Sequence, residues 1–168
     1  VEMEYASEFR YRKPEINKDD VIIAIAQSRE TADTLADIKM AKEQGALIIG
    51  ICNVAGSSIP RETHAGVYTH AGPEIGVAST KAFTAQVTVL SMFALMLGRS
   101  KKRLSKSQGQ EITRSMNKLG EYINEVLADD EQLKLVAKDT QNVNNYLYLG
   151  RGLNYPVALE GALTLKEI

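Results

Sequence analysis

Two continuous apolar segments in the first third of the chain constrain its fold more than any other feature. Residues 21–26 read VIIAIA and residues 46–52 read ALIIGIC. Neither segment alternates apolar with polar residues, so we expect both to be strands buried on two faces. Between them, residues 31–43 carry apolar side chains at helical spacing, and Gln44-Gly45 is a typical helix end. This order predicts an α/β fold in which a parallel sheet is flanked by helices.

The remaining elements are predicted from the same patterns. We expect a short third strand at 66–70, a long apolar helix at 79–97, and amphipathic helices at 111–127 and 131–138, the last capped by Asp129-Asp130. A fourth strand at 146–149, a polar turn and a helix from about Pro156 repeat the strand–turn–helix plan of residues 21–43. This repetition predicts the start of a second, similar domain. We expect a piece of a longer protein, because the chain begins without Met and ends within a helical pattern.

Composition excludes several classes of protein. The formal net charge is −1, and the basic segment 98–107 lacks interleaved aromatic residues, so a nucleic-acid partner is not expected. The longest apolar segment, 87–97, is too short for a bilayer, which needs about 20 residues. No secretory signal opens the chain. These observations favour a cytoplasmic protein without membrane contact.

The few cysteine and histidine residues do not suggest a metal site. Cys52 is the single cysteine, so neither a disulfide framework nor a multi-cysteine zinc site is possible within the chain. It lies in an apolar strand, where a small buried residue is favoured over a reactive thiol. His64 and His70 lack partners at ligand spacing and are interpreted as structural.

A polar cluster follows the first strand. Gln27, Ser28 and Thr31 bring an amide and two hydroxyl groups to the start of a helix, and Arg29 adds a positive charge. The first turn of a helix offers unpaired backbone N–H groups that suit phosphate. The alternative is that Ser28 or Thr31 only caps the helix. The cluster alone does not decide between phosphate binding and helix capping.

A second cluster favours the ligand-binding interpretation. Residues 71–86, AGPEIGVASTKAFTAQ, place glycines and the hydroxyls of Ser79 and Thr80 before another helix. In an open α/β sheet, two such turns can face the same crevice. Gly56-Ser57-Ser58 has a similar composition but is predicted to be a simple turn, since no helical pattern follows. Gly150-x-Gly152 is not a dinucleotide fingerprint, because Tyr155 stands where a third glycine is needed.

Six segments carry a family resemblance: YASEFRYR, QSRETADTL, ICNVAGSSIPRET, AGPEIGVASTKAFTAQ, LGRG and ALEGALTLKEI. The chain resembles the isomerase part of the glutamine–fructose-6-phosphate aminotransferases, over nearly its whole length. The resemblance implies a three-layer sugar-isomerase (SIS) fold that needs neither metal nor cofactor. It also implies hexosamine synthesis, in which fructose 6-phosphate becomes glucosamine 6-phosphate with ammonia from a separate glutaminase domain. The family's shared sites imply a homodimer.

The resemblance also implies domain limits and site residues. It divides the chain into a first SIS lobe lacking its amino-terminal part (1–103), a helical connection (104–137) and the truncated start of a second lobe (138–168). By position, Gln27, Ser28 and Thr31 match the phosphate-binding loop, and Val77 and Ser79 match contacts to the sugar chain. Glu167 matches the catalytic carboxylate that moves a proton between the first two sugar carbons.

The chain departs from the family pattern at three positions close to these residues. Ala26 and Arg29 stand in place of a serine and a glycine of the phosphate loop, and Thr164 replaces a lysine near the sugar. Loss of the hydroxyl at Ala26 is expected to weaken phosphate binding. Without the lysine, and with apolar neighbours such as Leu163 and Leu165, we expect Glu167 to hold its proton more strongly than the same residue in a relative that keeps the lysine.

Other parts of the family pattern are not in the chain. These include the Schiff-base lysine and the glutaminase domain, so we expect no synthase activity from the chain alone. The rival interpretation is a module that senses sugar phosphates without catalysis, as in transcriptional regulators of this fold. No helix-turn-helix is visible, and Glu167 together with the match at 71–86 favours the enzyme.

Overall fold

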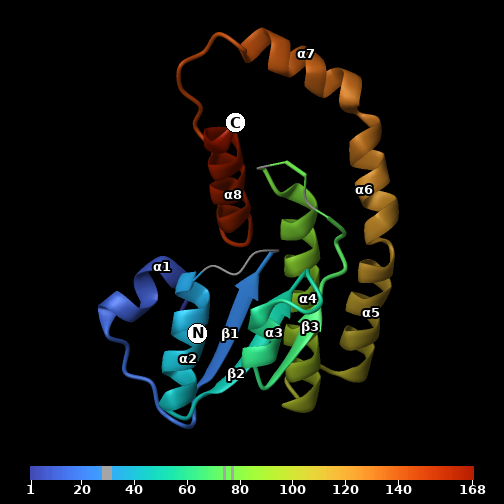
Figure 1. Ribbon diagram of the computed structural model, residues 1–168. Coiled ribbons are helices and arrows are strands. Elements are labelled where there is room, and N and C mark those ends of the chain that lie inside the picture. Colours follow the sequence, from blue (N-terminus) through green and yellow to red (C-terminus); the bar gives the residue numbers. More distant parts are fainter. Residues whose placement is uncertain (28–31, 74, 77) are drawn as a thin grey trace. The chain divides into compact units, whose positions relative to one another are not determined.

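The structure is a computed structural model that describes residues 1–27, 32–73, 75–76 and 78–168 (Figure 1). The chain forms two compact units, Val1–Ser91 and Met92–Ile168. Four residues that the sequence predicts to form or alter the site lie outside the described residues: Ser28, Arg29, Thr31 and Val77. The limits predicted for the SIS lobes remain predictions.

The first unit is built on a parallel sheet with the strand order β1-β2-β3. The strands are β1 (Val21–Ala26), β2 (Leu47–Cys52) and β3 (Ala65–Tyr68). The first two agree with the prediction to within a residue, and the third begins and ends slightly earlier than expected. Ala26 pairs with Cys52, and Cys52 pairs with Tyr68. All three strands therefore end at the same level, and the residues that follow them share one edge of the sheet.

Helices cover one face of this sheet with a continuous core. Alternate residues of β1 and β2 point to that face, where α2 (Ala32–Glu43) and α3 (Ser58–Glu62) pack on them. The core residues are Ala24, Ile38, Ala41, Ala46, Ile48, Cys52 and Ile59. On the other face Ile51 is buried, but Val21 and Leu47 are 54% and 45% exposed. The sheet is thus parallel and flanked by helices, as predicted, while the expected two-sided burial is complete on one face only.

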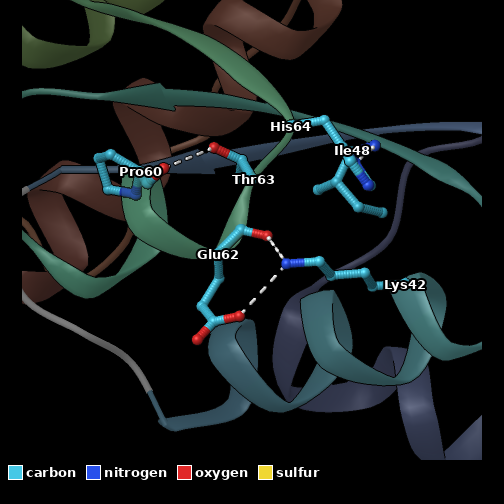
Figure 2. Close-up of polar contacts among 6 residues, drawn as sticks. All are labelled: Lys42, Ile48, Pro60, Glu62, Thr63 and His64. Atoms are coloured by element: carbon cyan, nitrogen blue, oxygen red, sulfur yellow. Dashed lines mark hydrogen bonds and ion pairs between the residues drawn. The ribbon is translucent and has the colours of Figure 1, made fainter.

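The helix α3 corrects the prediction of a simple turn at residues 56–58. Five residues are too short to show a periodic pattern, and Ser57 makes no side-chain cap. Ile59 is only 2% exposed, so tertiary packing stabilises a helix that local sequence does not specify. Lys42 of α2 adds a link, because its Nζ donates to the Glu62 carbonyl (3.1 Å) and pairs with the Glu62 carboxylate (3.6 Å), as Figure 2 shows.

His64 joins α3 to β3 and has a structural role, as expected. Its Nδ1 accepts a hydrogen bond from the Ile48 backbone N–H (3.0 Å), and the His64 backbone N–H donates to the Ile48 carbonyl (3.0 Å). The imidazole therefore continues the β2–β3 ladder at the opposite end of the sheet from the predicted site.

The amino-terminal segment is attached to the outer side of α2. It contains α1 (Ala6–Phe9) and the 3-10 helix η1 (Arg10–Arg12). Arg10 forms an ion pair with Asp33 in the first turn of α2 (2.7 Å). The pair fixes this segment beside the start of the helix that follows residues 27–31.

The helix α4 (Thr80–Ser100) begins in the first unit and continues into the second. It is longer than the predicted 79–97. By length and composition it is the one helix among the described residues that could cross a membrane. Core helices of globular proteins satisfy the same criterion, so this property alone does not indicate a membrane span.

The second unit continues with four helices: α5 (Lys106–Asn117), α6 (Leu119–Ala128), α7 (Asp130–Thr140) and α8 (Asn154–Glu167). The single helix predicted at 111–127 is two helices that meet at Lys118. Asp129 stands at the N-cap of α7, but its side chain makes no capping hydrogen bond. The α5 helix begins earlier than expected because Ser105 and Gln108 form a capping box.

The strand predicted at 146–149 is wrong: these residues belong to no strand or helix. A strand needs a neighbour for its backbone hydrogen bonds, and the described residues of this unit form no sheet. The turn that follows these residues requires a glycine at position 150. A Cβ on Gly150 would collide with the backbone of Asn154 and Tyr155, so the glycine allows the chain to pass close to the start of α8.

Candidate functional site

The carboxyl ends of the three strands bring Gln27, Asn53 and Thr69 to one edge of the sheet. Each of these residues directly follows its strand. The Asn53 backbone N–H donates to the Gln27 carbonyl (3.2 Å), and the Thr69 N–H donates to the Cys52 carbonyl (2.8 Å). The sheet ladder thus continues for one more residue, which fixes the backbone of Gln27 at the edge where α/β proteins bind ligands.

The side chain of Asn53 organises the loop that follows β3. Its Oδ1 accepts hydrogen bonds from the Ala71 N–H (2.8 Å) and the Thr69 hydroxyl (3.2 Å). Its Nδ2 donates to the Gly72 carbonyl (2.7 Å). The loop therefore turns around this one amide before it leads toward α4. Gly72 has φ +76°, a conformation that favours glycine.

The same loop leads to Ser79, a predicted sugar contact. Lys81 in the first turn of α4 donates to the Pro73 carbonyl (2.5 Å) and so joins the loop to the helix. The Ser79 Oγ is buried and has no hydrogen-bond partner among the residues that the structure describes. Since buried hydroxyl groups are normally paired, the Ser79 hydroxyl is a candidate contact for a polar ligand.

The structure places Gln27 and Ser79 in the first unit and Glu167 in the second. Glu167 is the last residue of α8 and is exposed. Leu163 and Leu165 are 46% and 40% exposed, so within this unit they do not provide the apolar surroundings that we expected around Glu167. The roles of Gln27, Ser79 and Glu167 remain predictions.

Cys52 lies beside this edge but is not a candidate nucleophile. It is 3% exposed, and burial raises the pKa of its thiol, which keeps the thiol protonated and unreactive. Among the described residues, no group of three or more His, Cys, Asp or Glu side chains is arranged to hold a metal ion. The described polar groups of the edge and its loop are the Asn53 amide, the hydroxyls of Thr69 and Ser79, the Lys81 ammonium and backbone groups.

Asn53 is the residue of this edge that sequence reasoning missed. A signal for it was present, because it is a polar residue directly after a buried strand, between Cys52 and Val54. The adjacent Gly56-Ser57-Ser58 was considered instead, and a simple turn was predicted there. The contact between Asn53 and the loop at 69–72 joins residues distant in sequence, so no local pattern reveals it.

Comparison with known proteins identifies the family. The family model described as "SIS domain" matches residues 1–96, more than half of the chain. The chain belongs to the SIS domain family. The match includes the three strands, the edge with Asn53 and most of α4, so α4 is a helix of the SIS domain.

Two curated relatives of this SIS chain carry the same name, glutamine–fructose-6-phosphate aminotransferase (isomerizing). The protein from Bacteroides thetaiotaomicron is 59% identical and that from Chlorobaculum tepidum 55% identical, each over 168 residues and the whole of this chain. The chain spans 27% of the length of each relative.

A solved structure has the same fold. The C-terminal domain of glucosamine-fructose-6-phosphate aminotransferase from Francisella tularensis is 40% identical and has a TM-score of 0.94. The match covers 98% of this chain and 47% of that one. These comparisons confirm the predicted family resemblance and the SIS fold.

Proposed function

We propose that the chain is the sugar-phosphate-binding isomerase part of an aminotransferase that forms glucosamine 6-phosphate from fructose 6-phosphate and glutamine. The 59% identity over the whole chain to an aminotransferase of this kind is the observation that carries the proposal. The edge formed by Gln27, Asn53 and the loop before Ser79 supports it, because its polar groups suit a phosphorylated sugar.

Several finer features belong to the same proposal. A glutaminase domain elsewhere in the full-length protein supplies ammonia, and the protein works as a homodimer in the cytoplasm, in hexosamine synthesis, without nucleic-acid or membrane partners. Gln27, Ser28 and Thr31 hold the phosphate, Val77 and Ser79 contact the sugar chain, and Glu167 moves the proton. The identity to the relatives supports these assignments.

The experiment uses the full-length protein that contains this chain. Calorimetric titration is expected to give at least about tenfold tighter binding of fructose 6-phosphate than of fructose, because hydrogen bonds to a charged group are worth about 1.5–3 kcal/mol each. Equal affinity for the two sugars would contradict the proposal.

A second measurement tests the catalytic carboxylate. Glu167→Gln is expected to abolish interconversion of fructose 6-phosphate and glucose 6-phosphate while the affinity for the sugar is retained. Glu125→Gln is the matched control, since Glu125 is an exposed carboxylate of α6. Full isomerase activity in Glu167→Gln would remove Glu167 from the mechanism.

A further inference from the structure

Asn53 connects three segments that lie far apart in the sequence, and we infer that it is a positioning residue of the sugar-phosphate site. Its amide holds the first residues of the loop after β3, up to Gly72, in one conformation at the edge of the sheet. The inference rests on the proposed function, and it adds a residue that neither the sequence patterns nor the family resemblance assigned.

The three side-chain hydrogen bonds require an amide. One end of the planar group accepts from Thr69 and Ala71, and the other end donates to Gly72 (2.7 Å). A carboxylate would keep the two accepted bonds but would place an oxygen against the Gly72 carbonyl oxygen, and an alanine would lose all three. Asn53 is half-buried, so water competes only partly for these groups.

The loop needs such support because its backbone is unfavourable on its own. Two of its residues have positive φ angles, His70 at 52° and Gly72 at 76°. A non-glycine residue such as His70 adopts this conformation only when its surroundings maintain it. The Asn53 bonds to Thr69 and Ala71 lie on either side of His70, and the bond to Gly72 holds the second position, so together they select this turn over more extended alternatives.

The effect of Asn53 reaches both predicted ligand segments. Its backbone N–H donates to the Gln27 carbonyl (3.2 Å), where the predicted phosphate loop begins. Its side chain fixes the loop up to Gly72, and the bond from Lys81 to the Pro73 carbonyl continues the connection to the start of α4, next to Ser79. Loss of the side chain should therefore reduce affinity for the sugar phosphate more than it reduces the rate of the bound complex.

The test compares two asparagines in the full-length protein. Asn53→Ala is expected to raise the KM for fructose 6-phosphate about five- to tenfold, with kcat changed less than about twofold. Asn17→Ala is the matched control, because Asn17 also accepts a backbone hydrogen bond (from Asp19, 3.3 Å) but lies in the turn before β1, at the other end of the sheet. The KM of Asn17→Ala for fructose 6-phosphate should stay within about twofold of the parent value.

A second pair of variants keeps the test valid if Asn53→Ala does not fold. Thr69→Val removes the hydroxyl that donates to Asn53 and should raise KM about two- to threefold, whereas Thr69→Ser retains the hydroxyl and should restore the parent value. In the sugar-free protein, hydrogen exchange at residues 69–73 should become faster in Asn53→Ala and not in Asn17→Ala.

The outcomes separate this inference from the proposed function. If the parent protein binds fructose 6-phosphate and Asn53→Ala binds it equally well, the positioning role is wrong while the proposed function stands. A KM increase of equal size in Asn17→Ala would also overturn the inference, because it would indicate a general structural effect. If the parent protein does not bind fructose 6-phosphate, the proposed function fails, and the role of Asn53 in substrate binding fails with it.

Discussion

The two units of the chain differ in what stabilises them. In the first unit, strands and helices distant in sequence meet around buried side chains such as Ile38, Ile48 and Ile59. In the described residues of the second unit, no apolar side chain of the helices is buried and most are exposed, for example Leu127 at 67% and Leu133 at 58%. Among the described residues, every buried apolar side chain lies between Ala24 and Ala82.

This difference shows that helical amphipathicity is not sufficient for burial. The helices α5, α6 and α7 contact mainly their neighbours along the chain, which leaves most of each helix surface in water. The sheet places each of three separate segments about 5 Å from the next, and helices can then exclude water from its face. The long-range contacts of the first unit also form the edge that carries the candidate site.

The largest expected difference between the units concerns truncation of an apolar side chain. Ile48→Ala in β2 should lower the free energy of unfolding by about 2–5 kcal/mol, because Ile48 is fully buried and its loss leaves a cavity. Leu133→Ala in α7 should change it by less than about 0.5 kcal/mol. Urea unfolding followed by circular dichroism measures both, and equal losses would break the comparison.

Replacing a glycine by alanine should destabilise the protein in the first unit and stabilise it in the second. A Cβ on Gly66 in β3 would lie 2.5 Å from the Gly50 carbonyl oxygen of β2, so Gly66→Ala should destabilise the protein by about 1–3 kcal/mol. A Cβ on Gly120 in α6 would meet no atom within 4 Å, so Gly120→Ala should stabilise its helix by up to about 1 kcal/mol. Thermal unfolding measures both, and destabilisation by Gly120→Ala would show that α6 is packed more tightly than its exposure indicates.

The smallest expected effect concerns the pH dependence of the first unit. Burial raises the pKa of Asp37 above its ordinary value of 3.8, with Arg10 opposing the shift and Asp33 adding to it. A carboxyl group with a raised folded pKa contributes stability that is present below its unfolded pKa and is lost as the pH rises through its folded pKa. Asp37→Asn should therefore raise the urea midpoint near pH 7, and the gain should shrink toward pH 3.5.

A neighbouring carboxylate provides the control. Asp33 pairs with Arg10, so Asp33→Asn should lower the urea midpoint slightly near pH 7. A midpoint gain for Asp37→Asn that did not depend on pH would show that packing, and not the buried charge, is responsible. In the second unit Asp130 is an exposed partner of Lys134, and Asp130→Asn should not give a gain at neutral pH.

The sequence was most informative where the pattern was long. The apolar segments at 21–26 and 46–52 predicted β1 and β2 almost to the residue, because continuous β-branched residues bounded by turn signals have few alternatives. The helix between them was predicted equally well. The family resemblance came from motifs of up to 16 residues, and the comparisons confirm it.

The sequence was least informative where an element depends on partners elsewhere in the chain. The strand expected at 146–149 has a suitable apolar composition, but no strand lies beside it among the described residues. The short helix α3 has no periodic pattern and depends on the burial of Ile59. In both cases the tertiary neighbour, and not the local preference, determines the conformation.

In the candidate site, too, some features follow from local sequence and others depend on tertiary contacts. The sequence by itself determined the α/β class, the family and the positions of Gln27 and Ser79 after a strand and before a helix, since these follow from local patterns and motif spacing. Only the tertiary structure decided that Asn53 holds the loop at 69–72, and that this loop and Gln27 share one edge. The physical reason is that the strand register, set by long-range backbone hydrogen bonds, brings residues 27, 53 and 69 to the same level.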